Sequence, residues 1–147
     1  MGKSMAGHLM SKGYSLSIYT RTKAKAEELL NMGAQWKDIK EIAEESDFLF
    51  MMLGYPHDVE DVVFNNENGL LHHMKEGAIL IDHTTSSPGQ AVRIYEEALK
   101  KKISFIDAPV SGGDIGARNG KLVTMIGGDE EAVAKAKPLL ECYSLEI

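Results

Sequence analysis

Uninterrupted runs of apolar residues recur along the chain, and each is closed by a turn or by polar residues. The longest covers residues 48–53 and another covers residues 78–81, while residues 103–106 form a similar run that contains Ser104. A run of this kind predicts a strand buried on both faces, as in a parallel sheet covered by helices. Shorter extended segments are expected at residues 16–19, 34–36 and 121–126.

Between these runs, apolar residues recur every three or four positions, which is the spacing of an amphipathic helix. Gly33 follows one such segment as a C-terminal cap, Asp38 precedes the next as an N-cap, and Pro88 suits the first turn of another. Helices are expected at residues 2–11, 23–32, 39–45, 57–64, 88–101 and 129–143. The alternation predicts an α/β fold with a doubly wound, mostly parallel, Rossmann-like sheet.

In such a sheet the carboxyl ends of the strands lie at one edge, where open α/β sheets bind their ligands. Polar or glycine-bearing loops follow four of the expected strands, at residues 20–22, 53–56, 83–85 and 107–113. Because all four loops are expected at the same edge, we predict that the functional site lies there.

The loop at residues 107–113 ends in Ser111, Gly112 and Gly113. Glycines have no Cβ atom, so a small anionic substrate can reach their N–H groups and the Ser111 hydroxyl. This pattern indicates a substrate-binding loop. The alternative is that the glycine pair only makes a tight turn.

Arg21 lies about twenty residues beyond the first glycine, where dinucleotide-binding units carry the residue that contacts the adenosine ribose. An acidic residue there holds the ribose hydroxyls of NAD, whereas an arginine accommodates the 2′-phosphate of NADP. Thr20 and Thr22 flank the guanidinium with hydroxyls. The segment therefore favours NADP over NAD as the cofactor, and the alternative is a solvated surface charge.

Thr84 and Thr85 precede the helix expected at residues 88–101. Their hydroxyls can bind a nicotinamide ribose or carboxamide. Alternatively, this segment caps the helix through Ser86 or Ser87.

The composition narrows the class of protein. The chain has 147 residues, enough for a substantial core, and we expect one domain over residues 1–147. A net charge of −6 with scattered basic residues argues against nucleic acid as a partner. There is no apolar stretch of about 20 residues, and the single cysteine, Cys142, cannot form an internal disulfide. These features favour a cytoplasmic protein, in the cytosol or an organelle matrix, without a membrane partner. Cys142 itself is expected to be a small buried apolar side chain.

No metal site is expected, because the histidines are dispersed and none has the spacing of a ligand pair. The adjacent His72 and His73 are expected on the solvated surface. No nucleophile and base stand together either. Neutral hydroxyls and backbone amides suit a redox cofactor, which brings its own reactive centre.

Several segments resemble the 3-hydroxyisobutyrate dehydrogenase (β-hydroxyacid dehydrogenase) family, which includes semialdehyde reductases. Residues 1–9 resemble the tail of its cofactor fingerprint, G-L-G-x-M-G-x-x-M-[AS]-x-x-L. Residues 107–113 resemble its substrate motif D-A-P-V-S-G-G, and residues 120–128 resemble the G-x-L-x-x-M-x-G-G that follows. The resemblance runs through the whole chain.

The resemblance implies cofactor contacts at named positions. Met1 and Gly2 are expected at the phosphates, Leu53 and Pro56 in the loop over the cofactor, and Thr85 on the nicotinamide side. Arg21 is similar to the arginine of the members that prefer NADP.

The implied reaction is hydride transfer between NADP(H) and a short β-hydroxyacid or its semialdehyde, with Ser111, Gly112 and Gly113 on the substrate carboxylate. The family's catalytic lysine, its α-helical second domain and its usual first strand match no part of the sequence. We therefore expect an inactive and marginally stable cofactor-domain fragment of an enzyme that is a homo-oligomer at full length. The alternative is a non-catalytic nucleotide-binding or assembly module.

Overall fold

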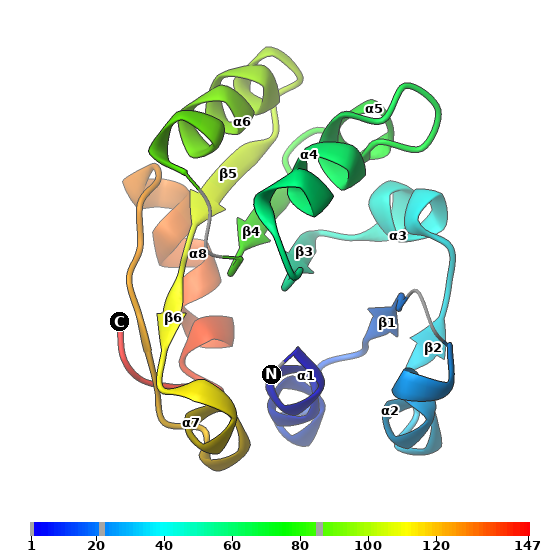
Figure 1. The fold of residues 1–147 in the computed structure, drawn as a ribbon, viewed down its shortest axis with the longest axis vertical. Helices are drawn as coiled ribbons and strands as arrows, with labels where there is room; N and C mark the ends of the chain where they lie inside the picture. Colours follow the sequence, from blue (N-terminus) through cyan, green and yellow to red (C-terminus); the bar gives the residue numbers. More distant parts are fainter. Residues whose placement is uncertain (1, 21–22, 85–86) are drawn as a thin grey trace.

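The computed structural model describes residues 2–20, 23–84 and 87–147 (Figure 1). Its strands are β1 (Ser17–Ile18), β2 (Gln35–Trp36), β3 (Phe48–Met51), β4 (Ile79–Asp82), β5 (Ser104–Asp107), β6 (Val110–Ser111), β7 (Leu122–Thr124) and β8 (Ser144–Glu146). Its helices are α1 (Gly2–Ser11), the 3₁₀ helix η1 (Lys23–Ala26), α2 (Glu27–Asn31), α3 (Ile39–Glu45), α4 (Pro56–Phe64), α5 (Leu70–His73), α6 (Pro88–Lys100), α7 (Gly113–Asn119) and α8 (Glu130–Leu140).

The centre of the molecule is a parallel sheet in the order β3-β4-β5. Its strands come from the three apolar runs, and every residue of β4 is buried. Leu49, Leu80 and Phe105 lie in register across the sheet, so their side chains share one face. The prediction of buried parallel strands is confirmed.

Helices cover both faces of this sheet (Figure 1). On one face, Leu80 packs in a cluster with residues of α3, α4, α5 and α6, among them Val59 and Ile94. On the other face, Ile79 and Ile81 pack with residues of α1, α7 and α8. Alternate residues of β4 thus supply two cores, and the doubly wound architecture is confirmed.

Two smaller sheets flank the central one. β1 and β2 are parallel, while β6 is antiparallel to β7, which is parallel to β8. In Figure 1 the β1–β2 pair lies away from β3, near α2. The mostly parallel pairing agrees with the prediction, but the strands form three sheets.

Some elements differ from the prediction. The segment at residues 23–32 is a 3₁₀ turn followed by the short α2, and the glycine-rich loop contains a helix, α7. α5, β6 and β8 were not predicted, because such short elements depend on neighbours that lie far away in sequence. Asp38 occupies the N-cap position of α3, but its side chain makes no capping hydrogen bond. Among the described residues, no helix is both long and apolar enough to cross a membrane.

Candidate functional site

The carboxyl ends of β3, β4 and β5 lie side by side with the N-terminus of α1. Met51, Asp82 and Asp107, the last residues of these strands, are in register. A Cβ atom added to Gly2 would lie 3.6 Å from Cβ of Met52, so the first turn of α1 meets the loop after β3. A helix N-terminus offers unpaired N–H groups and a positive dipole end, which suits an anionic group.

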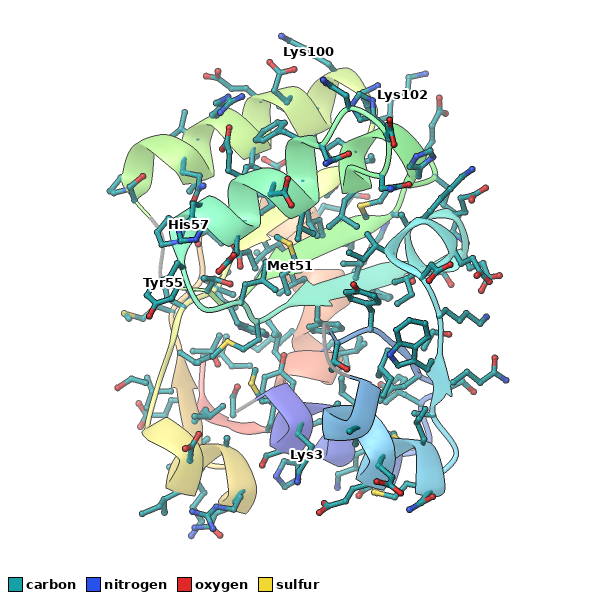
Figure 2. All side chains as sticks on the ribbon, turned by 45° about the vertical axis from the view of Figure 1, so that its right-hand side comes forward. Lys3, Met51, Tyr55, His57, Lys100 and Lys102 are labelled. Carbon is teal, nitrogen blue, oxygen red and sulfur yellow. The ribbon has the colours of Figure 1, made fainter. Side chains whose placement is uncertain are left out.

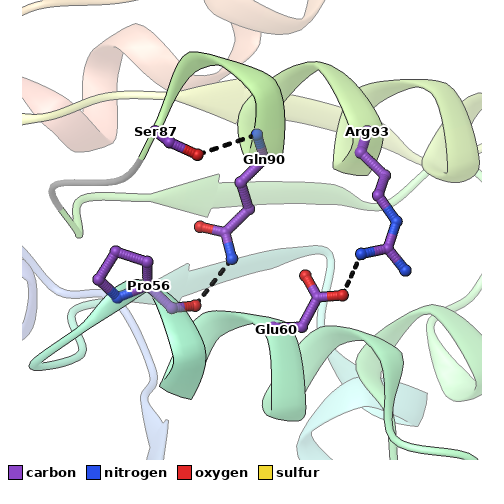
Figure 3. A network of polar contacts seen from close by, with 5 residues as sticks. All are labelled: Pro56, Glu60, Ser87, Gln90 and Arg93. Atoms are coloured by element: carbon purple, nitrogen blue, oxygen red, sulfur yellow. Dashed lines mark hydrogen bonds and ion pairs between the residues drawn. The ribbon is translucent and has the colours of Figure 1, made fainter.

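Side chains from other segments hold the main chain of the loop after β3. The N–H group of Leu53 donates to Oγ1 of Thr84 at 2.9 Å. Pro56 begins α4, and its carbonyl accepts a 2.7 Å bond from Nε2 of Gln90 on α6 (Figure 3). Tyr55 is 65 % exposed and stacks on His57, with 5.6 Å between ring centroids; both side chains lie at the outer end of this loop (Figure 2). The loop thus presents an exposed aromatic side chain on an anchored backbone.

Asp82 is fully buried at the end of β4. Its Oδ1 accepts from the N–H group of Thr84 at 2.9 Å, but its Oδ2 has no hydrogen-bond partner among the described residues. Burial raises the pKa of Asp82 to about 6, and the neighbouring Asp107 carboxyl adds to the rise, while hydrogen bonds from Thr84 oppose it. Burial also raises the pKa of Asp107. The two carboxyls face the α4 and α6 side of the sheet, in register with each other.

His83 is buried, and the sequence reasoning did not single it out. Its Nδ1 lies 2.6 Å from the carbonyl oxygen of Ala108, and its Nε2 lies 2.6 Å from the hydroxyl of Tyr143. A carbonyl can only accept, so Nδ1 carries the proton. Burial lowers the pKa of His83, which keeps the ring neutral and leaves Nε2 as the acceptor of the Tyr143 hydroxyl. Its place in the sequence could have predicted its burial, because His83 follows a buried strand and continues the face formed by Ile79 and Ile81.

The Ser-Gly-Gly turn opens α7. Ser111 ends β6, and Gly112 precedes α7 with φ of 129°, followed by Gly113 with φ of 61°. All three are exposed. The φ angle of Gly112 favours glycine, and a Cβ atom there would also lie 3.2 Å from Cδ2 of Leu122, which would have to shift. The turn therefore keeps its main chain open to small molecules.

The turn lies in the same layer as α1. Nε2 of His8, on α1, lies 2.8 Å from the carbonyl oxygen of Ala117, on α7. Figure 1 shows the two helices side by side. The candidate substrate turn and the candidate phosphate site are therefore carried by helices that pack on each other.

The structure brings some of the predicted site residues together, but not all of them. It brings together Gly2, Leu53 and Thr84, whereas Thr20 follows β1 in the separate β1–β2 pair. Ser87 accepts a 3.3 Å bond from the N–H group of Gln90 and caps α6, so the capping alternative holds for this serine. The remaining predicted contacts lie outside the described residues: Met1, Arg21, Thr22 and Thr85.

The histidines and the cysteine discussed from the sequence can be placed in the structure. Among the described residues there is no cluster of three or more potential metal ligands, and the expectation of no metal site stays a prediction. His72 is exposed and His73 is half-buried, with Nε2 2.7 Å from the carbonyl oxygen of Glu67. Cys142 is only half-buried, not fully buried as predicted, and burial raises the pKa of its thiol, which opposes reactivity.

These groups fit a dinucleotide. The Gly2 end of α1 suits a pyrophosphate, and the loop after β3, which the buried Thr84 hydroxyl holds, brings neutral backbone beside it. The carboxyl of Asp82 is fully buried. Fold and site together define a dinucleotide-binding α/β domain.

Comparison with known proteins identifies the family. The model of the NAD binding domain of 6-phosphogluconate dehydrogenase matches residues 1–147, so the chain belongs to this family. The Bacillus subtilis (strain 168) oxidoreductase YkwC is 51% identical over 140 residues, which is 95% of this chain and 48% of that protein. The mitochondrial 3-hydroxyisobutyrate dehydrogenase of Mus musculus is 39% identical over 149 residues, which is 100% of this chain and 44% of that protein. The resemblance to 3-hydroxyisobutyrate dehydrogenases is thereby confirmed.

A solved structure gives the same result for the fold. The structure of Psf3 in complex with NADP+ and 2-OPP matches with a TM-score of 0.95 at 28% identity, over 99% of this chain and 52% of that chain. The Rossmann-like architecture is confirmed. The chain spans about half the length of the curated relatives it matches.

Proposed function

We propose that residues 1–147 form the NADP(H)-binding domain of an oxidoreductase that interconverts a short β-hydroxyacid and its semialdehyde. The observation that carries the proposal is the meeting of the α1 N-terminus with the anchored loops after β3 and β4. The family match supports the dinucleotide, and the mouse relative's name supports a 3-hydroxyacid as the substrate class.

The proposed cofactor contacts combine this placement with the contacts that the family resemblance implies. The N-terminus of α1, at Met1 and Gly2, would hold the phosphates, and Leu53 and Pro56 would lie over the cofactor. Arg21, with Thr20 and Thr22, would bind the 2′-phosphate, and Thr85 would contact the nicotinamide side. Psf3, a structural relative, is solved with NADP+, whereas a relative that is 33% identical is named an NAD-dependent L-serine dehydrogenase, so the choice of NADP rests on Arg21.

Ser111, Gly112 and Gly113 would bind the substrate carboxylate through one hydroxyl and two backbone N–H groups. When bound, NADPH supplies the hydride that reduces the semialdehyde carbonyl carbon. The proton for the carbonyl oxygen comes, in the scheme the resemblance implies, from a lysine that matches no residue of this sequence. We therefore expect no turnover from residues 1–147 alone, and we expect the natural enzyme to be a homo-oligomer.

Cofactor choice is tested by fluorescence titration of the natural gene product that contains this chain, with NADPH and with NADH. We expect NADPH to bind more tightly, and Arg21→Ala to weaken NADPH binding about tenfold or more while NADH binding changes little. Arg118→Ala, which removes an arginine of α7, is the control. Tighter binding of NADH than of NADPH would contradict the cofactor assignment.

Activity separates the enzyme from the non-catalytic alternative. We expect the natural gene product to consume NADPH in the presence of a short semialdehyde such as tartronate semialdehyde. Binding of NADPH without consumption of any short semialdehyde, or without oxidation of any short β-hydroxyacid by NADP+, would favour a nucleotide-binding module.

A further inference from the structure

Three consecutive polar residues, Asp82, His83 and Thr84, are buried at the carboxyl end of β4. Consecutive residues of an extended strand point to opposite faces. Asp82 continues the face of Leu80, and His83 continues the face of Ile79 and Ile81. This end of β4 therefore reaches into both layers of the fold.

Thr84 holds the loop after β3. Its Oγ1 accepts the N–H group of Leu53 at 2.9 Å, and its own N–H group donates to Oδ1 of Asp82 at 2.9 Å. Thr84 is 2 % exposed, so water cannot replace these bonds. The position of the Leu53 backbone therefore depends on the Thr84 hydroxyl.

His83 holds the start of the loop after β5. Its Nδ1–H group donates to the carbonyl of Ala108 at 2.6 Å, and its Nε2 accepts the Tyr143 hydroxyl at 2.6 Å. The ring also stacks on Phe50, with 6.0 Å between centroids and 20° between planes. Ala108 precedes Pro109 and the Ser-Gly-Gly turn, so the direction in which this loop leaves the sheet depends on the ring.

We propose that the β4 terminus sets the geometry of the two halves of the site separately: Thr84, supported by Asp82, positions the cofactor loop, and His83, supported by Tyr143, positions the substrate loop. Both are positioning residues, since neither is accessible to a ligand. The assignment of cofactor and substrate to the two loops rests on the proposed function. Burial lowers the pKa of His83 and raises that of Tyr143, which supports a neutral ring that accepts from a protonated phenol.

The test uses matched variants in the natural gene product. Thr84→Val keeps the shape but removes the acceptor, and Thr84→Ser restores it. His83→Leu removes the donor to Ala108, and His83→Asn keeps an N–H group near the position of Nδ1. Tyr143→Phe is a milder change that removes only the support of the ring.

The first readout is the separation of the two Michaelis constants. We expect Thr84→Val to raise KM for NADPH about fivefold to tenfold and to leave KM for the semialdehyde within about twofold, because one buried hydrogen bond is lost on the cofactor side only. His83→Leu should raise KM for the semialdehyde and leave KM for NADPH nearly unchanged. Tyr143→Phe should change the same constant in the same direction by a smaller factor. Thr84→Ser and His83→Asn should restore most of each loss. A similar change of both constants in every variant would overturn the proposal.

The second readout is amide hydrogen exchange followed by mass spectrometry, which needs no activity. Thr84→Val should speed exchange in a peptide covering residues 52–56 and not in one covering residues 108–113, and His83→Leu should show the opposite pattern. Equal protection in both variants and the wild type would refute the positioning role. Failure of the proposed function is distinct, because a wild type that neither binds nor uses NADPH would leave these exchange patterns intact.

Discussion

Replacing Asp82 by asparagine should change how the stability of the domain depends on pH. Asp82 has no exposed surface, and one carboxyl oxygen lacks a partner among the described residues. Burial disfavours the charged form, so the pKa of Asp82 rises from 3.8 to about 6 in the folded chain. Ionised Asp82 therefore destabilises the fold at neutral pH, and asparagine carries no such charge.

The sign and size follow from linkage. Between pH 3.8 and about 6, the folded state holds a proton that the unfolded state has released, so the free energy of unfolding falls as pH rises through this window. A difference of about 2 pKa units corresponds to about 3 kcal/mol at 1.36 kcal/mol per unit. Below pH 3.8, the pKa of the unfolded state, Asp82 does not destabilise the fold. Above about pH 6 the full destabilisation is present.

The assay is urea unfolding at several pH values, followed by circular dichroism, for the wild type and for Asp82→Asn. We expect the free energy of unfolding of the wild type minus that of the variant to fall by about 3 kcal/mol from pH 3 to pH 7. Asp47→Asn, which removes an exposed carboxyl, controls for the loss of one negative charge. A difference that stays constant with pH, or that rises, would refute the reasoning that Asp82 is buried without adequate compensation.

Two further predictions concern the loops. Gly112→Ala should destabilise the domain by about 1–3 kcal/mol, because the glycine has φ of 129° and the new Cβ would crowd Leu122. Gly113→Asn, with open space and φ of 61°, should cost less than about 1 kcal/mol. Equal losses of stability in thermal unfolding would argue against strain at Gly112. Gln90→Leu should weaken NADPH binding about threefold to tenfold without a large loss of stability, because it frees the carbonyl of Pro56 at the start of α4 (Figure 3), and unchanged titration curves would exclude this link.

The sequence was sufficient to predict the central sheet. Residues 48–53 and 78–81 carry apolar side chains at successive positions, and runs this short, bounded by turn residues, are typical of strands covered on both faces. Parallel order then places the strand ends together, which is why the site edge could be foreseen. The contacts of Leu53 could not, because its partner Thr84 lies far away in sequence and is chosen by the register of β3 and β4.

The glycine-rich segment was harder to predict, for a physical reason. Gly113 and Gly116 lower helix propensity, and no helix was expected at residues 113–119. The helix forms because Ala117 is buried in the core cluster beside α1, and because Gly120 ends it in the left-handed conformation. Tertiary packing, which no local pattern encodes, decides the element that holds the candidate substrate turn.

The burial that makes β4 predictable also explains the chemistry at its end. A polar side chain withdrawn from water costs about 1–3 kcal/mol unless it is hydrogen-bonded, so each polar residue that continues a buried strand must find partners inside the protein. His83 and Thr84 find theirs in the two neighbouring loops, and those bonds restrict the loops. Asp82 has a partner for only one oxygen among the described residues, and burial raises its pKa. A buried strand that ends in polar residues therefore fixes the binding-site loops to the core. A histidine or threonine at such a strand end is better interpreted as a residue that positions a loop than as one that contacts the bound molecule.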